Sequence, residues 1–244
     1  MNSLDLFEHH IIKPFAFMGL THSFWDINLD TIIFTWLALL IIAMLALAGR
    51  TMLKYPETIP GYLSLSYART ISSMITQSTE KYRYRYVAFI GSLFTYIFIC
   101  NLIVILPFVE EPTKDLNTTL ALALISFTYV QREAIRAHGI WGYIKEFFKP
   151  FAVFFPLEVL GKLATIVSLS FRLFGNIFGG SIVGTMWAQA LSGSIIAQTL
   201  GILLGINFII MIFFGLFEGL IQAFVFSILT LTYLSMATRE EEHE

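Results

Sequence analysis

The sequence predicts an all-α polytopic membrane protein, a single membrane domain over residues 1–244 with about five transmembrane crossings. Apolar residues make up 57% of the chain and charged residues only 13%, whereas a soluble domain is about 25% charged. A water-soluble globule of this composition would expose more apolar surface than solubility allows. The 15 Lys and Arg are offset by 17 Asp and Glu, so no basic excess indicates a nucleic-acid partner.

Three uncharged runs in the first half predict transmembrane helices at 31–49, 86–109 and 116–131. A helix needs about 20 apolar residues to cross a hydrocarbon core of about 30 Å, so the third run is short but can be extended. Residues 1–30 form an outer N-terminal segment. They lack a basic region followed by a short apolar stretch, and so predict no cleaved signal.

The last third of the chain predicts two long helices, at 155–190 and 198–236, joined as a hairpin by the Ser and Gly residues near position 193. At 1.5 Å per residue these helices would measure about 54 and 58 Å. Neither fits upright in a core of about 30 Å, so we expect both to be strongly tilted, to kink or to extend beyond the membrane.

The distribution of basic residues predicts the topology. Eleven lie in the loops after the first and third spans or in the tail at 237–244: Arg50, Lys54, Arg69, Lys81, Arg83, Arg85, Arg132, Arg136, Lys145, Lys149 and Arg239. The opposite side carries only Lys13 and Lys114. Because basic loops stay inside, the N-terminus is expected outside and the C-terminus inside, which requires an odd number of crossings.

The inner linker at 50–85 contains a further helical pattern. Tyr67, Ile71, Met74 and Ile75 recur at helical spacing. This stripe predicts an amphipathic helix on the inner membrane surface, with an ordinary anchored loop as the alternative.

Four ionisable residues fall inside the predicted membrane helices of the last third: Glu158, Lys162, Arg172 and Glu218. Each costs roughly 2.5–3.5 kcal/mol on insertion scales, so such residues are candidates for function. On a helical wheel Thr165 and Asn176 lie within about 40° of Glu158, as do Lys162 and Arg172. On the last helix Asn207 and Gln222 lie within about 40° of Glu218.

Two interpretations of these polar stripes remain open. In the first, the stripes face each other, and a Glu–Arg pair with amide hydrogen bonds holds the helices together. In the second, the stripes line ion-conducting paths, with Arg172 as a fixed positive barrier. A guanidinium keeps its proton in a protein, whereas the carboxylates of Glu158 and Glu218 can relay one.

Glycines spaced four residues apart follow the arginine, including Gly175–Gly179, Gly180–Gly184 and Gly215–Gly219. Such pairs are typical of ordinary close packing between membrane helices. Beside Arg172 they would also let a helix of another protein reach the guanidinium.

The segment SLSFRLFGN at 168–176 resembles subunit a of F-type ATP synthases, and the resemblance extends over nearly the whole chain. It includes Asn101-Leu102 near the end of the second span and Gln222 within IQAFVF. The resemblance implies a stator subunit that passes ions to and from a rotor ring of small subunits. It implies that Arg172 faces the ring carboxylate, that Asn176 and Gln222 belong to the outer half-channel, and that Glu158 belongs to the inner one.

The chain departs from the family pattern at positions that often carry a Glu or a His. Those positions are Ser181 and Gly215 here, and a position that is acidic in some members is Val104. We hypothesise that Glu218 takes the outer carboxylate role. Lys162 has a simple alternative role, an i, i+4 ion pair with Glu158.

The resemblance also implies the partners: the rotor ring, peripheral-stalk subunits, the lipid bilayer and, indirectly, the catalytic head. We expect no cofactor, no metal and no catalytic activity in the chain itself. A bacterial plasma membrane is the expected location, with an organelle membrane as the alternative, and protons are favoured over sodium. A secondary transporter would show internal repeats, and an intramembrane hydrolase would need a suitable nucleophile and base; neither pattern is seen.

Overall fold

The computed structural model describes residues 11–12, 27–79, 83–106, 109, 111–146, 151, 153, 155–192, 209 and 212–239. The elements in chain order are β1 (Ile11–Ile12), β2 (Ile27–Asn28), α1 (Leu29–Met52), α2 (Ile59–Ser78), α3 (Tyr84–Leu102), η4 (Ile103–Ile105), η5 (Pro112–Lys114), α4 (Leu116–Glu146), α5 (Phe155–Ser192), η7 (Ile212–Glu218) and α8 (Gly219–Thr238). The fold is almost entirely helical, which confirms the predicted class. The two short strands form one antiparallel pair in which Ile12 faces Ile27.

Side-chain caps fix where several helices begin. Asn28 Oδ1 accepts a hydrogen bond from the Asp30 amide at 3.0 Å, immediately before α1. Thr58 caps α2 and is followed by a proline in the first turn. Asp115 Oδ1 accepts a hydrogen bond from the Asn117 amide at 2.9 Å at the start of α4. Such groups satisfy the first amides of a helix, which have no partner within it.

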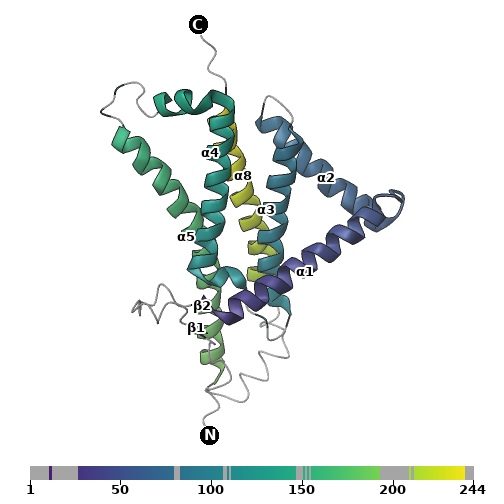
Figure 1. Cartoon of the computed structure of the whole chain (residues 1–244). Coiled ribbons are helices and arrows are strands. Elements are labelled where there is room, and N and C mark those ends of the chain that lie inside the picture. Colours follow the sequence, from purple (N-terminus) through teal and green to yellow (C-terminus); the bar gives the residue numbers. More distant parts are fainter. Residues whose placement is uncertain are drawn as a thin grey trace.

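The bundle has α3, α4 and α8 at its centre, with α5 on one side and the pair α1 and α2 on the other (Figure 1). Its largest apolar core joins α3, α4, α5 and α8 through Leu93, Ile97, Leu122, Ala123, Ile166, Leu169, Leu173, Ile177, Ala223 and Phe226. This packing fixes which face of α5 and of α8 is turned away from the core.

Within the described residues, four helices are long and apolar enough to cross a membrane: Leu29–Met52, Tyr84–Ile105, Phe155–Trp187 and Ile212–Thr238. The chain is therefore a polytopic membrane protein. The expected third span at 116–131 lies inside α4 and is not among the four, because the polar residues of α4 lower its hydropathy. This helix nevertheless packs lengthwise against α5 and α8.

The linker helix α2 turns its apolar stripe toward the protein. Ile71 and Ile75 are buried with Tyr86 of α3 and Leu231 of α8, and the Tyr67 hydroxyl donates to the Gly91 carbonyl at 2.9 Å. The helical interpretation of the linker is confirmed, and the anchored-loop alternative is wrong for 59–78. The stripe contacts neighbouring helices, because apolar side chains of α3 and α8 are buried with it.

The two long helices of the last third are described in part. α5 is 38 residues long, about 57 Å at 1.5 Å per residue, and it diverges from α4 and α8 toward one end of the bundle (Figure 1). The last helix is described from Ile212 onward. The turn between them and most of 198–211 lie outside the described residues, as does most of the N-terminal segment.

A glycine bends the end of α4. Gly139 has φ 71° and ψ 167°, outside the helical region, and the residues that follow it form a short arm across the end of the bundle. This backbone conformation is essentially restricted to glycine.

We predict that Gly139→Ala destabilises the protein by about 1–3 kcal/mol, because alanine at this φ is strained. The thermal unfolding midpoint of the purified protein measures the effect. Gly49→Ala is the matched control: Gly49 is helical and a Cβ there meets nothing within 4 Å, so it should be neutral or slightly stabilising. Equal midpoints for the two variants would contradict the prediction.

Candidate functional site

Arg172 lies in the middle part of α5, on the side away from the core. Leu169, Leu173 and Ile177 face the core, and Arg172 is exposed. Among the residues that the structure describes, no ion pair or hydrogen bond joins Arg172 to another side chain. The predicted intramolecular Glu–Arg pair is therefore not formed there, and the guanidinium points out of the chain.

Glycines extend the exposed face around Arg172. An added Cβ at Gly161, Gly175 or Gly179 would meet nothing within 4 Å. On a helical wheel all three lie within about 60° of Arg172. This part of α5 therefore presents a flat, small-residue surface with a single cation on it.

Asn176, one turn after Arg172, contacts Glu218 across the two helices. With the amide oriented so that its nitrogen faces the carboxylate, Asn176 donates to Glu218 Oε1 at 2.7 Å and to Oε2 at 3.3 Å. The two polar stripes predicted from the sequence therefore meet at this point. The contact joins α5 to the end of η7, so it also supports the view that amide hydrogen bonds help to hold the helices together.

The segment that leads to Glu218 is π-helical, from Ile212 to Glu218. Such wide turns are rare and often lie at functional sites. Gln222, one turn further on in α8, is half-buried. No hydrogen bond to Gln222 is found in the described part of the chain, so the structure brings it near Glu218, the last residue of η7, only through their spacing of four residues in the sequence.

Close packing against α3 holds this region in place. An added Cβ at Gly219 would lie 2.7 Å from Asn101 Cβ, and the buried Asn101 side chain donates to the Gly219 carbonyl at 3.4 Å. The Thr113 hydroxyl donates to Asn101 Oδ1 at 3.0 Å. The backbone beside Glu218 is thus fixed by a buried amide.

Two of the three positions at which the chain departs from the family pattern are neighbours. An added Cβ at Gly215 would lie 2.6 Å from Val104 Cγ1, so the position that often carries a His abuts the position that is acidic in some members. Both are apolar here. Ser181 lies elsewhere on α5 and donates to the Phe178 carbonyl at 2.8 Å.

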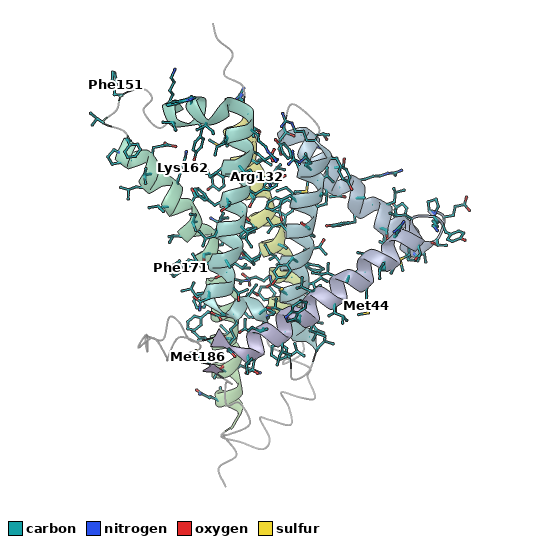
Figure 2. All side chains as sticks on the ribbon, viewed as in Figure 1. Met44, Arg132, Phe151, Lys162, Phe171 and Met186 are labelled. Atoms are coloured by element: carbon teal, nitrogen blue, oxygen red, sulfur yellow. The ribbon has the colours of Figure 1, made fainter. Side chains whose placement is uncertain are left out.

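Glu158 lies apart from the other candidate residues. Lys162 Nζ is 3.6 Å from Glu158 Oε1, so the predicted i, i+4 ion pair is present. Figure 2 shows Lys162 at the end of the bundle that holds Arg132, with Phe171 nearer the middle. Glu158 and Lys162 are therefore nearer the end of α5, and Arg172 is at greater depth.

Two buried polar contacts were missed by sequence reasoning. The hydroxyl oxygens of Thr119 in α4 and Ser170 in α5 lie 3.1 Å apart. Ser170 is two residues before Arg172. Glu133, only 1% exposed, lies 2.6 Å from Arg136 and 3.5 Å from Arg85. The i, i+3 spacing of Glu133 and Arg136 was a usable signal, whereas the contact with Arg85 depends on how α3 and α4 pack.

No group of three or more His, Cys, Asp or Glu side chains is placed to hold a metal ion within the described ranges. The chemistry available at the site is therefore that of one exposed arginine, two carboxylates on different helices and their amide neighbours.

Together the fold and the site define a polytopic membrane protein that places an exposed arginine, an amide and a carboxylate where two long apolar helices meet. The model of the ATP synthase A chain family matches residues 32–235, most of the chain. The chain therefore belongs to this family.

Several relatives are similar over nearly their full length. ATP synthase subunit a 2 of Picosynechococcus sp. is 32% identical over 234 residues, which is 95% of this chain and 94% of the relative. ATP synthase subunit a of Hydrogenobaculum sp. is 35% identical and covers 77% of this chain and 88% of its own. That of Moorella thermoacetica is 34% identical, with 84% and 89% covered.

We predict that Gly215→Ala destabilises the protein by about 1–3 kcal/mol through overpacking against Val104. Adding Val104→Ala should remove the clashing Cγ1, so the double variant should lose less stability than the sum of the two single variants. Thermal unfolding midpoints of the four proteins form the cycle. Gly184→Ala, where a Cβ meets nothing within 4 Å, is the control. Strict additivity would rule out the proposed contact.

Proposed function

We propose that this chain is the ion-translocating stator subunit of an F-type ATP synthase, and that Arg172 faces the ion-binding carboxylate of a rotor ring. One observation carries the proposal: Arg172 is exposed in the middle of a membrane helix, and no partner for it is found among the described residues. An ionised group at that depth is costly, so a carboxylate supplied by another subunit is the expected counterion.

The surface around Arg172 is suited to contact with a helix of another subunit. The open positions at Gly161, Gly175 and Gly179 allow a second helix to approach the backbone of α5 closely. A ring of closely packed small subunits would present its carboxylates to this face one after another.

The charges of the site suit proton transfer in two separate steps. The outer path passes Glu218, Gln222 and Asn176 and delivers a proton to the ring carboxylate, which is then neutral and can turn into lipid. The inner path begins near Glu158, where the proton leaves. Arg172 holds the ionised carboxylate and cannot relay a proton itself, so it separates the two paths.

The hydrogen bond between Asn176 and Glu218 supports the role assigned to Glu218. It holds a carboxylate one helical turn beyond Arg172, in the region where the family often carries its Glu or His. The apolar contact between Gly215 and Val104 leaves Glu218 as the ionisable group of this segment.

The location and the orientation follow from the same proposal. We infer a bacterial plasma membrane, with the N-terminus outside and the C-terminus inside, from the basic loops and from relatives of bacterial origin. Protons are the proposed ions. Each charge that crosses supplies about 2.3 kcal/mol per 100 mV. The peripheral-stalk subunits would hold the chain still while the ring turns, and catalysis would belong to the head.

Replacing Arg172 with Ala tests the barrier. We predict that Arg172→Ala abolishes proton-driven ATP synthesis in membrane vesicles and raises passive proton leak, because nothing then holds the ring carboxylate or separates the paths. The control is Arg132→Ala, which removes an exposed arginine near the end of the bundle and should leave synthesis largely intact. A coupled and tightly sealed Arg172→Ala protein would overturn the proposed function.

The outer carboxylate is tested by Glu218→Gln, which keeps the shape and removes the titrating group. We predict that ATP-driven proton pumping falls by roughly 100-fold or more, the scale of a lost acid–base group. Glu57→Gln, an exposed carboxylate in the loop between α1 and α2, should pump normally. Normal pumping by Glu218→Gln would remove Glu218 from the path without affecting the assignment of Arg172.

A further inference from the structure

A buried carboxylate holds two arginines together where the start of α3 meets α4. Glu133 of α4 is 1% exposed, and its Oε1 lies 2.6 Å from Arg136 of α4 and 3.5 Å from Arg85 of α3. The two arginine side chains are themselves 36% and 56% exposed. Guanidiniums that share one oxygen atom lie close together although their charges repel. The carboxylate therefore fixes a pair of exposed cations at this point, the arginine pair.

The arginine pair retains most of its capacity to bind an anion. Each guanidinium has five N–H donors, and one carboxylate oxygen occupies only a small share of them. Two cations less one anion leave Arg85, Arg136 and Glu133 with a net charge of +1. Arg83 and Arg132, both exposed, add positive charge close by in the sequence. Because guanidiniums bind phosphate oxygens through parallel hydrogen bonds, this patch fits a phosphate group.

Apolar side chains continue from the arginine pair along the same faces of α3 and α4. Phe89 follows Arg85 by four residues, and Tyr129 and Ile125 precede Glu133 by four and eight. The Phe89 and Tyr129 rings stack with centroids 3.7 Å apart, and the Tyr129 hydroxyl donates to the Arg85 carbonyl at 3.2 Å. We call Phe89, Tyr129 and Ile125 the α3–α4 stripe. It extends about 12 Å along α4 from Glu133, most of one leaflet of about 15 Å.

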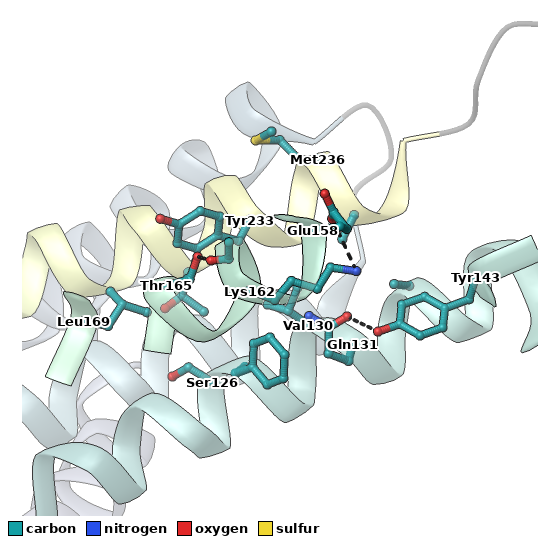
Figure 3. Close-up of a pocket in the computed structure, with 15 residues that line it drawn as sticks. Ser126, Val130, Gln131, Tyr143, Glu158, Lys162, Thr165, Leu169, Tyr233 and Met236 are labelled. Atoms are coloured by element: carbon teal, nitrogen blue, oxygen red, sulfur yellow. Dashed lines mark hydrogen bonds and ion pairs between the residues drawn. The ribbon is translucent and has the colours of Figure 1, made fainter. Parts of the chain in front are cut away.

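The α3–α4 stripe lies at the outside of the bundle. Ile125 is 55% exposed, and with Tyr96 of α3 it lines a cavity of about 550 Å³ beside α1. The pocket beside Glu158 is a different surface, and Figure 3 shows that Ser126 and Gln131 of α4 belong to it. On a helical wheel these two residues are centred about 130° away from the α4 part of the stripe.

We propose that the arginine pair and the α3–α4 stripe bind an anionic phospholipid, with the phosphodiester on the two guanidiniums and one acyl chain along the stripe. The patch lies at the membrane surface, because Arg85 directly precedes the expected span at 86–109 and Glu133 follows that at 116–131. Basic pockets between membrane helices on the inner side bind anionic headgroups. A soluble phosphate would use the arginines and leave the stripe uncovered.

This inference goes beyond the ion path, and it depends on the proposed orientation only for the choice of the inner leaflet. It gives Glu133 a positioning role, since the buried carboxylate holds the two arginines that contact the headgroup. The apolar stripe sets the direction of the acyl chain, from the membrane surface toward the middle of the bilayer.

Photolabelling in the assembled complex tests the site. The purified complex is placed in phosphatidylcholine vesicles with a trace of phosphatidylglycerol or phosphatidylcholine that carries a diazirine in one acyl chain, and mass spectrometry locates the label. We expect phosphatidylglycerol to label residues 88–96 and 121–129 at least about fivefold more than phosphatidylcholine, the ratio that one net charge gives at a membrane surface. Equal labelling by the two lipids would overturn the site.

A neutral variant tests the arginine pair. Arg85→Gln, Glu133→Gln and Arg136→Gln are combined, so that no charge is left buried without a partner. We expect the preference for phosphatidylglycerol to be lost. The matched control is Arg69→Gln, which removes an exposed arginine of α2 and should keep the preference. A neutral variant that labels like the wild type would rule out headgroup binding by the arginines.

A second variant decides the question if the neutral one fails to assemble. Arg85→Lys with Arg136→Lys keeps both charges and the ion pairs with Glu133 but loses the planar fork of the guanidinium. The preference should then fall by about threefold or more. An unchanged preference would contradict the proposed contact between the guanidiniums and the phosphodiester.

Two further outcomes distinguish other ligands from a lipid. Excess inorganic phosphate should compete weakly, because it gains nothing from the stripe, and complete loss of the preference would assign the arginines to a soluble phosphate group. A cross-link from these residues to another protein subunit, in place of the lipid, would assign the surface to that subunit. Either result would overturn the proposal. Labelling requires no ion flow, so its outcome is independent of the test with Arg172→Ala.

Discussion

The requirement that polar groups inside a membrane find partners within protein governs most of this structure. Hydrocarbon offers no hydrogen bonds, so a group left alone there is costly. The buried amide of Asn101 satisfies Thr113 and the Gly219 carbonyl, and Asn176 reaches the carboxylate of Glu218. These contacts fix α5, η7 and α8 relative to α3. Arg172 differs from these groups. Its helix packs against the core through Leu169 and Leu173, but its charged side chain is exposed on the outer face.

Much of the fold could be predicted from the sequence, because the thickness of a bilayer sets the length of the apolar run that a crossing helix needs. It also placed the polar residues of each long helix on a single stripe, since the angle between residues on one helix is fixed by its period, and left open whether the two stripes would meet. It could not predict what those stripes would contact. The stripe on α2 faces other helices, and Glu133 is buried between two arginines. Both outcomes depend on the packing of separate helices, which no local pattern records.

Two local departures from regular helix set the positions of polar side chains near the two long helices of the last third. The wide turns of η7 deliver Glu218 to Asn176, and a helical wheel of one period cannot be continued through them. The bend at Gly139 brings Tyr143 to Lys162. In each case a change of backbone conformation brings a side chain to a contact that it would not reach from a straight helix. A helical wheel assumes a constant period, so it could predict neither the contact of Glu218 with Asn176 nor that of Tyr143 with Lys162.

The outward charge of Arg172 has a consequence for how the protein is made. A chain inserted alone would carry a cation against lipid, and only a partner that binds the inserted form would relieve this cost. By mass action, the fraction of chains that stay folded in the membrane then depends on the concentration of the partner. With the proposed rotor ring as that partner, Arg172 would also make the lone subunit the least stable form, and the abundance of this chain would follow the abundance of the ring.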